Sequence, residues 1–543
     1  MKSSRWIPVF INCIGLVLLL VFLSLKYEAL LDSDASAEIL LAKILTQTGG
    51  IMTDRWYYST ELRVVNMQLL LKLALLIFAD YKQARLFATF VYMLLIVASF
   101  LFMMKAAGLF RAGLLASAFL LFPFNDQYLE YLIVYMGYGV YIFFSFLVLG
   151  TVFLIFKSVG FHEGKLLPYF PEKGSIIKTA ALLLTGALLC FIASLNSFRQ
   201  LMVLNMPLFA SGVILAVYEL YQGWKASGRF ERCFGRGLLL TCISAVYAFA
   251  SLCGVAASRI LFSVYFSSNK VYQWNSFQFH NLLDCLTDIA NFFGWTASQD
   301  MFSAFGIINL ASFVMPAIMI YFTAKMVRLF KDRTDSEKVL LLYTLSALAI
   351  LLFMYSMINM YQAKYWLVIM QFVYTIPCIF LAERSSRTSA AIYALLIGII
   401  ALSSLSLFNA TRLSEEKGAY IEAEKWLTKN GYERGYANYW QADLFGELSS
   451  GRLEMYTVNE DSPKSMDRLD ELGSIKPWLQ DKRHIQELPE GGFFVMLTEQ
   501  YFDLDNKDEA KLLSLPEYLV YENKYVRIYG FKDMEEYRAA MAK

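Results

Sequence analysis

The sequence of 543 residues is poor in charge and in the residues that most enzymes use for metal or nucleophilic chemistry. Only 17% of its residues are charged, it has 3 histidines and 7 cysteines, and no cysteine follows residue 378. No CxxC, HExxH, GxSxG or glycine-rich phosphate loop occurs in it. These absences leave zinc hydrolysis, elbow-type serine hydrolysis and nucleotide hydrolysis without support, and they exclude a disulfide framework after residue 378.

Long hydrophobic runs take the place of those motifs. Hydrophobic residues make up 57% of the chain, which is too many for a soluble protein of this length. A helix that crosses the ~30 Å hydrocarbon layer needs roughly 20 mainly apolar residues. The sequence predicts eleven such spans, near 7–25, 86–104, 112–124, 131–156, 180–195, 200–221, 237–262, 301–323, 338–358, 365–382 and 389–408. The third is the shortest.

The distribution of basic residues predicts how these spans are oriented. Lys2 and Arg5 precede the first span, and no small-residue cleavage site follows it, so we interpret it as a retained anchor. With the N-terminus inside, every basic loop falls on the cytoplasmic side, as the positive-inside rule requires. These loops lie near 105–111, 157–173, 225–236, 325–333 and 384–387. Eleven spans then place the C-terminus outside.

The loop 26–85 is predicted to be a long outer loop with two helices at the membrane surface. Apolar residues recur at helical spacing over 37–45, which predicts an amphipathic helix that begins just after Asp34. A second apolar segment, 64–78, has only fifteen residues with Lys72 near its middle. We expect it to be an interfacial or re-entrant helix and not a twelfth span.

The composition changes after residue 408. Residues 409–543 have 18 Lys and Arg against 26 Asp and Glu, whereas residues 1–408 have 30 against 20. A helical pattern over 411–430 precedes strand-like runs at 435–440, 453–458, 491–497 and 525–531. We therefore predict a transmembrane domain, 1–408, and a small extracytoplasmic α/β domain, 409–543, whose acidic balance is typical of a solvated surface.

Two aspartates stand at the outer end of the first span, in "LLDSDASAEILLAKILTQTGG". One interpretation is structural: Asp34 caps the following helix by accepting from its first-turn amides, which is worth about 1 kcal/mol. That role accounts for one aspartate and not for Asp32. The functional interpretation is a carboxylate pair that takes a proton from an acceptor hydroxyl or holds a divalent cation against a phosphate.

The order of these features resembles the GT-C glycosyltransferases. The resemblance is carried by a span, an acidic pair, the helix "DASAEILLAKIL", an interfacial helix and "QARLFATF" before the second span, together with "GYANYWQADLFGELSSGRLEMYTV" in the tail. Members move a sugar from a polyprenyl phosphate carrier to an acceptor on the outer face, and they include protein mannosyltransferases and bacterial aminoarabinose transferases. The resemblance implies an all-α polytopic membrane protein with interfacial helices and an outer domain.

The resemblance also implies roles for the two aspartates. In that family an acidic residue of the first outer loop is the catalytic base or a metal ligand, and the distance to "AK" at 42–43 places Asp34 there, with Asp32 beside it. A divalent cation, Mg or Mn, is the one cofactor this implies. The usual adjacent acidic residues and the proline pair of the interfacial helix are absent, the latter replaced by "TELRVVN", so donor and acceptor identity do not carry over.

A lipid phosphate donor needs cations at the outer interface, where few are found. The candidates are Arg63, Arg199, Lys364 and His280, with Glu61 as a nearby substrate contact. An arginine fork matches phosphate oxygens bidentately. The alternative for each basic residue is that it reaches lipid headgroups while its stem lies along apolar surface.

The leading hypothesis is an inverting membrane glycosyltransferase that uses a polyprenyl-phosphate-linked sugar donor and a glycan, lipid or protein acceptor. A polymerase or ligase of lipid-linked glycans is the enzymatic alternative, and a lipid or glycan transporter or an inactive relative is the other. Charges within the spans are few, which disfavours transport. We expect a multi-pass protein of a bacterial plasma membrane that contacts membrane lipids and no nucleic acid.

Overall fold

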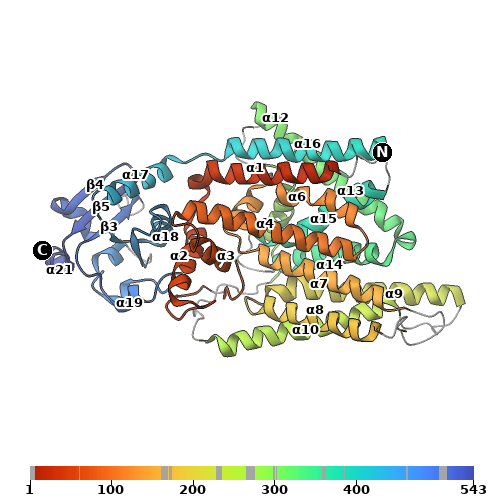
Figure 1. Ribbon diagram of the computed structural model, residues 1–543. Helices are drawn as coiled ribbons and strands as arrows, with labels where there is room; N and C mark the ends of the chain where they lie inside the picture. Colours follow the sequence, from red (N-terminus) through yellow and green to blue (C-terminus); the bar gives the residue numbers. More distant parts are fainter. Residues whose placement is uncertain are drawn as a thin grey trace. The chain divides into compact units, whose positions relative to one another are not determined.

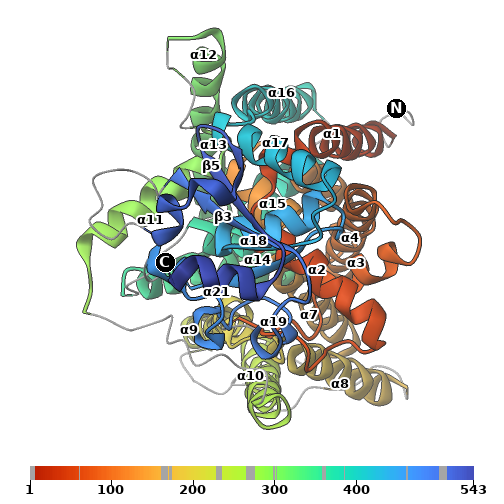
Figure 2. The ribbon, with the colours of Figure 1, turned by 90° about the vertical axis from the view of Figure 1, so that its left-hand side faces the viewer.

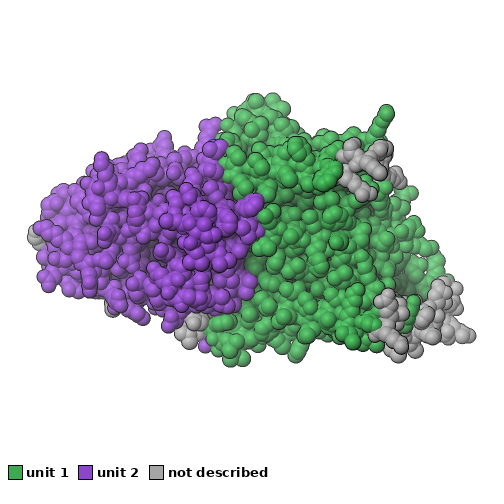
Figure 3. Space-filling view, in the orientation of Figure 1, with its two compact units in different colours: residues 1–21, 92–262, 270–410 green, residues 22–91, 263–269, 411–543 purple. Residues whose placement is uncertain are grey.

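The computed structural model describes residues 6–59, 62–160, 169, 174–227, 235–263, 276–296, 300, 302–357, 363–383, 386–459, 463–499 and 510–542 (Figure 1). The chain forms two compact units, which Figure 3 shows in different colours. Unit 1 comprises Met1–Val21, Tyr92–Phe262 and Lys270–Ala410. Unit 2 comprises Phe22–Val91, Ser263–Asn269 and Thr411–Lys543, so the loop that was predicted to be outer clusters with the tail. The division at residue 408 stays a prediction.

Ten helices of the described residues are long and apolar enough to cross a membrane. They are Trp6–Leu30 (α1), Tyr81–Ala106 (α4), Gly139–Ser158 (α7), Ser175–Ser194 (α8), Leu201–Lys225 (η3 and α9), Arg236–Leu261 (α10), Ala304–Arg328 (α12, η5 and α13), Asp335–Tyr355 (α14), Ala363–Glu383 (η7 and α15) and Arg387–Ala410 (α16). The chain is therefore a multi-pass membrane protein with a helical membrane part, as predicted.

The remaining predicted span, 112–124, forms two short helices. They are α5 (Phe110–Ala116) and α6 (Ala118–Leu121), which together cover Phe110–Leu121. A helix rises about 1.5 Å per residue, so this segment is too short to cross ~30 Å of hydrocarbon by itself. Whether this segment crosses the membrane decides whether the two termini lie on the same side. The count of eleven spans and the outer C-terminus therefore stay predictions.

Two helices form the interior of unit 1. In the apolar windows of α7 and of the segment that contains α15 (Leu367–Glu383), 83% and 94% of the residues are buried. The helices α5, α13, α14 and α16 pack around α15, and α8 packs on α7. Helices that are apolar on every side are buried in a protein core or in lipid, and these two lie in the protein core. Two further segments, the π-helix η2 (Tyr128–Val134) and α11 (Phe279–Asn291), connect these helices.

The two helices predicted in the first outer loop are present in unit 2. The first, α2 (Ser33–Thr48), begins before Asp34 and not after it, because Asp32 is the residue that caps it. It ends at Gly49, whose φ of 83° suits glycine. The second, α3 (Gln68–Leu75), is shorter than predicted. Lys72 of α3 donates to the carbonyl oxygens of Gly49 and Gly50 at 2.8 and 2.7 Å and so ties α3 to the end of α2.

The tail of unit 2 is the predicted α/β fold. Its strands are β1 (Arg434–Asn438), β2 (Glu454–Val458), β3 (Phe493–Thr498), β4 (Leu519–Glu522) and β5 (Val526–Phe531), in the order β2-β1-β3-β5-β4. β1 is parallel to β2 and β3, while β5 is antiparallel to β3 and β4. The sequence did not predict β4, an edge strand whose residues alternate between half-buried and exposed.

Helices cover both faces of this sheet. The helices are α17 (Glu415–Lys429), α18 (Tyr439–Leu448), α19 (Arg483–Gln486) and α21 (Met534–Ala542). Buried Phe493, Val495 and Tyr436 of the strands pack with Tyr537 of α21 in one core. In Figure 1 the strands lie between α21 and α18. Because α18 starts directly after β1, its first residues lie at the carboxyl end of a parallel strand, where binding sites of α/β folds occur.

Candidate active site

The two aspartates before α2 have different environments. Asp32 is the N-cap residue, and its Oδ1 accepts a hydrogen bond from the backbone N–H of Ala35 at 2.7 Å. Asp34 lies in the first turn, where a carboxylate is stabilised by the positive end of the helix dipole. The capping role that the sequence suggested for Asp34 therefore belongs to Asp32. Asp34 is left without a cap function that would explain it.

Asp34 is held against the tail by α18. The hydroxyl of Tyr439, the first residue of α18, donates to Oδ1 of Asp34. One residue before Asp34, Ser33 Oγ donates to the backbone carbonyl of Tyr439 at 2.5 Å. The helices α2 and α18 lie side by side (Figure 1, Figure 2). Their packing places the carboxylate of Asp34 at the carboxyl end of β1.

A buried ion pair lies one turn further along α2. Glu38 is fully buried and forms an ion pair with Arg63, which is only 5% exposed. Burial raises the pKa of Glu38, and the positive charge of Arg63 opposes that rise. Arg63 was predicted to hold a phosphate, but in the structure it compensates a carboxylate inside unit 2. Residues four apart share one face of a helix, so Asp34 and Glu38 project from the same side of α2.

A second buried carboxyl group lies on α18. Asp443 is 2% exposed, and its Oδ2 has no hydrogen-bond partner among the residues that the structure describes. Burial raises the pKa of Asp443 well above its ordinary value, and the charge of Asp34 raises it further. A carboxyl group in such surroundings holds its proton more tightly than an exposed one. Burial therefore favours the neutral form of Asp443.

The position of α18 is secured by a second buried ion pair. Arg85, at the start of α4, donates through Nε and Nη2 to the two oxygens of Glu447 at 2.7 and 2.8 Å. The same guanidinium donates to the carbonyl of Ala35 at 2.8 Å, and the hydroxyl of Tyr27 donates to Glu447 at 2.5 Å. A bidentate arginine pair of this kind fixes direction as well as distance. It joins α1, α2, α4 and α18 in one network.

Few protein groups are available to bind a metal ion together with Asp32 and Asp34. Within the described ranges, no group of three or more His, Cys, Asp or Glu side chains is arranged to hold a metal ion. One oxygen of Asp32 is used by the helix cap, and one of Asp34 accepts from Tyr439. Magnesium usually binds one or two carboxylates together with substrate phosphates and water. The residues present do not by themselves form a magnesium or manganese site.

Arg199 and Lys364 come together in unit 1 around one tyrosine ring. The Arg199 guanidinium carbon lies 4.6 Å from the ring centroid of Tyr138 and 4.8 Å from that of Tyr365. Lys364 Nζ lies 5.8 Å from the ring centroid of Tyr138 and 4.4 Å from that of Tyr131. An aromatic ring attracts a cation through its quadrupole but has no net charge. The cluster therefore orients two positive groups without neutralising them through the rings.

The other two predicted contacts join neither cluster. His280 is an exposed residue of the first turn of α11. Glu61 lies outside the described residues. The roles of these residues stay predictions.

Sequence reasoning missed four residues of the unit 2 site: Glu38, Tyr439, Asp443 and Glu447. The sequence could have identified Glu38, because it follows Asp34 by four residues in a predicted helix and so shares its face. The other three are about 400 residues further along the chain. Arg85 was noted only as part of a motif, since nothing in "QARLFATF" points to its partner.

The comparisons with known proteins concern the fold. No protein-family model and no curated protein sequence matches the chain. ArnT from Cupriavidus metallidurans, in a crystal structure with bound undecaprenyl phosphate, is 12% identical with a TM-score of 0.54, over 97% of this chain and 98% of that one. The apo ArnT structure gives 11% and 0.53, over 98% of each chain. The apo oligosaccharyltransferase of Archaeoglobus fulgidus, 11% identical, reaches 0.48 over 91% and 70%. Over nearly its whole length, the chain has the fold of ArnT.

Proposed function

We propose that the protein is an integral membrane glycosyltransferase that moves a sugar from a polyprenyl phosphate carrier to a hydroxyl group of an envelope glycan, lipid or protein. The fold supports this proposal, because the similar ArnT structure is one bound to undecaprenyl phosphate. The ten apolar helices agree with a donor that is itself a membrane lipid. The sequence similarity is too low to carry the donor sugar or the acceptor across.

One observation carries the proposal: Asp34 is a carboxylate that the helix cap does not use and that neighbouring residues hold in place. Asp32 performs the structural role, while Tyr439 orients Asp34. The buried pairs Glu38–Arg63 and Arg85–Glu447 fix the two helices on either side of it. Holding a catalytic group by packed and hydrogen-bonded neighbours is how a protein builds a general base.

The reaction assigns Asp34 the role of base. The acceptor hydroxyl oxygen attacks the anomeric carbon of the donor sugar, a new carbon–oxygen bond forms, and the proton of the hydroxyl moves to Asp34. The bond between the anomeric carbon and the phosphate oxygen breaks, and its electron pair leaves with the polyprenyl phosphate. The configuration at the anomeric carbon inverts. Asp34 later returns the proton to water.

Arg199 and Lys364 are proposed to bind the donor phosphate. The leaving phosphate gains negative charge as the bond breaks, and positive groups held in place stabilise that charge. Ring contacts orient both groups around Tyr138. A divalent cation held by Asp32 and Asp34 together with the donor phosphate stays a prediction, which is tested by adding a chelator to the assay.

Substitution of Asp34 by Asn tests the proposed function. The amide keeps the size of the side chain and can still accept from Tyr439, but it cannot take a proton. Losing a general base costs about 10²- to 10⁴-fold in rate, so we expect the variant to reach the membrane and to transfer almost no sugar. The measurement is the monosaccharide composition of envelope glycans in a deletion strain that carries the wild type or a variant at matched membrane levels.

Asp32→Asn is the matched control for this experiment. Asparagine caps helices about as well as aspartate, so this variant should restore the missing sugar as the wild type does. Normal transfer by Asp34→Asn would refute the assignment of the base. A deletion strain with an unchanged sugar profile would remove envelope glycosylation as the function and favour a transporter or an inactive relative.

The location of the protein is part of the proposal. We propose a bacterial plasma membrane with residues 411–543 on the outer face, supported by the positive-inside distribution of the basic loops. Fusing reporters that are active on only one side of the membrane after Ala410 and after Lys543 tests this. A C-terminus on the cytoplasmic side would refute it and would mean that Phe110–Leu121 does not cross.

A further inference from the structure

Unit 2 contains a cleft that the proposed reaction does not explain. Its volume is about 590 Å³, within the range of roughly 300–1,000 Å³ that small-molecule sites occupy. Its walls come from α2, the segment after α2, the start of α4, α18, the strands β1 and β2, and α19. Asp443 is part of its lining. All of its lining residues belong to unit 2.

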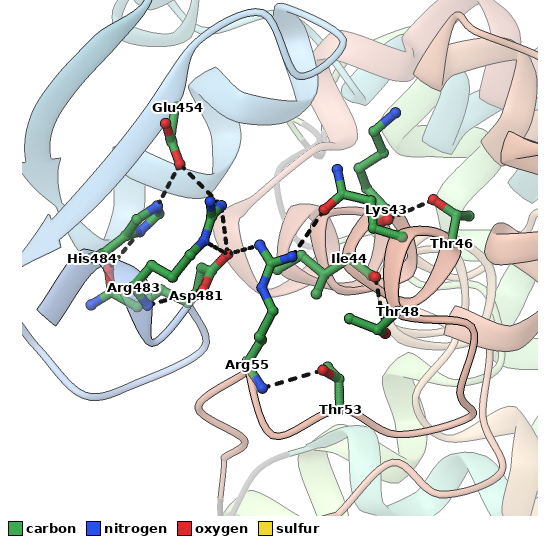
Figure 4. A network of polar contacts seen from close by, with 12 residues as sticks. Lys43, Ile44, Thr46, Thr48, Thr53, Arg55, Glu454, Asp481, Arg483 and His484 are labelled. Carbon is green, nitrogen blue, oxygen red and sulfur yellow. Dashed lines mark hydrogen bonds and ion pairs between the residues drawn. The ribbon is translucent and has the colours of Figure 1, made fainter. Parts of the chain in front are cut away.

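One wall of the cleft is a network of polar contacts, shown in Figure 4. Arg55 donates to Asp481 at 2.5 Å, and Trp56 pairs with Asp481 as a β-bridge. Arg483 binds the same Asp481 oxygen at 3.0 Å. The backbone N–H of Tyr57 also donates to the carbonyl of Gln480 at 2.9 Å. A site built on such paired segments is organised before any ligand arrives.

The charges of the lining leave a positive excess. Asp481 is paired with Arg55 and Arg483, and Glu454 is paired with Arg434, Arg483 and His484. By contrast, Lys43 is exposed and forms no ion pair with any residue that the structure describes. Arg452 has a side chain that is 64% exposed, and it forms a long ion pair of 3.9 Å with Glu424, which is not part of the lining. Among the acidic residues of the lining, Asp481 and Glu454 are paired within the wall, Asp443 is buried and Glu433 is exposed. Five basic residues therefore stand against four acidic ones in the lining, and Lys43 is a cation without an ion pair among the described residues.

The deeper lining offers polar atoms that have no partner. The indole Nε1 of Trp56, a residue only 2% exposed, has no hydrogen-bond partner among the described residues, and neither has Oδ2 of Asp443. A buried polar group without a partner costs free energy, which suggests a ligand that supplies both donors and acceptors. The hydroxyl groups of a sugar do both. Trp56 and Tyr81 add aromatic surface to the same lining.

We propose that this cleft binds a saccharide that carries an anionic group, a phosphate or a carboxylate. If the proposed function holds, the cleft binds the sugar headgroup of the acceptor. Helix α18 connects the cleft with the base: Tyr439 hydrogen-bonds to Asp34, and Asp443, four residues further on the same helix face, lines the cleft.

Binding of simple sugars to the full-length protein in lipid nanodiscs tests the proposal. The probes are glucose 6-phosphate, glucuronate, glucose and inorganic phosphate, measured by saturation-transfer difference NMR. We expect at least one anionic sugar to bind saturably in the millimolar range and more tightly than glucose or phosphate alone. The anionic sugar that binds identifies the preferred anion. Equal binding of glucose, or no saturable binding of either anionic sugar, would overturn the proposal.

Charge reversal at the rim supplies the second measurement. Lys43→Glu combined with Arg452→Glu replaces two exposed cations, so the fold should be preserved while the affinity for the anionic sugar falls by about tenfold or more. Lys532→Glu is the matched control, because Lys532 has a side chain that is 87% exposed and is not part of the cleft lining. Unchanged affinity in the double variant, or an equal loss in the control, would also overturn the proposal.

The two proposals fail in different ways. Asp34→Asn should keep the affinity for the anionic sugar while it loses transfer. If the deletion strain shows no sugar missing and the cleft still binds an anionic sugar, the proposed function fails and the cleft proposal stands. If transfer depends on Asp34 and no anionic sugar binds, the cleft proposal alone fails.

Discussion

The cations of the two units are held in different ways. In unit 2, Arg85 and Arg63 are buried against Glu447 and Glu38, and carboxylates balance their charges. In unit 1, Arg199 and Lys364 lie on the faces of tyrosine rings. The first arrangement can hold helices together, because an ion pair without net charge can be buried. The second orients a cation through the quadrupole of an aromatic ring. The partner of a basic residue, more than its position in an outer loop, indicates its role.

The largest effect is expected when the buried pair of unit 2 is broken. Glu447→Ala leaves Arg85 buried without its carboxylate, which costs roughly 3–5 kcal/mol in the free energy of unfolding. The measurement is thermal unfolding of the purified protein. Glu454→Ala, at an ion-paired position of the same domain that is 37% exposed, should cost no more than about 1 kcal/mol. Similar losses in the two variants would contradict the structural role assigned to Arg85 and Glu447.

Substitution of Arg199 should cost less stability than substitution of Glu447. Its main expected effect is weaker binding of the donor. Arg199→Ala removes its ring contacts, worth at most about 2 kcal/mol when desolvated, together with a proposed phosphate ligand. Arg199→Lys keeps the charge but loses the planar fork, so it should only partly restore transfer. The apparent affinity for the polyprenyl phosphate donor is the quantity to measure. Wild-type affinity in Arg199→Ala would assign the tyrosine cluster a structural role.

The pH dependence of stability should reveal the buried carboxyl group of Asp443. Its pKa is raised in the folded protein by burial and by Asp34. Between about pH 3.9, the ordinary pKa of Asp, and the folded pKa, the folded protein therefore holds a proton that the unfolded chain has lost. Since the unfolded state binds fewer protons, the free energy of unfolding falls as the pH rises through that window.

Asp443→Asn removes this term. Relative to the wild type, the variant should gain stability with rising pH, by up to about 1.4 kcal/mol per pH unit within the window. Unfolding of both proteins at several pH values measures the difference, in which titration of the other carboxylates largely cancels. Parallel profiles would mean that Asp443 is ionised in the folded protein.

The smallest effect is expected at the helix cap. Asp32→Ala removes the acceptor for the amide of Ala35 and should cost about 1 kcal/mol of stability while transfer persists. Thermal unfolding and the envelope sugar profile measure the two quantities. A loss of transfer as complete as that expected for Asp34→Asn would mean that the two aspartates act together as a catalytic pair.

Much of the fold was predictable because its elements follow local patterns. Ten of the predicted spans correspond to candidate membrane helices, since length and apolarity are properties of a single segment. Four strands and the helix α17 were expected from their residues. The start of α2 was misplaced by the presence of two possible cap residues, Asp32 and Asp34, only one of which can occupy the N-cap. The edge strand β4 lacks an apolar run and was missed.

By itself, the sequence determined that this is a multi-pass helical membrane protein with a small α/β tail, and it singled out Asp34, Arg199 and Lys364. Tertiary structure alone decided that Arg63 neutralises Glu38, that Arg199 and Lys364 share Tyr138, and that Asp443 lines a cleft beside the helix that holds Asp34. Hydrophobic periodicity is set by neighbours along the chain. Pairing of charges depends on burial and on distances between residues about 400 positions apart, which no local pattern encodes.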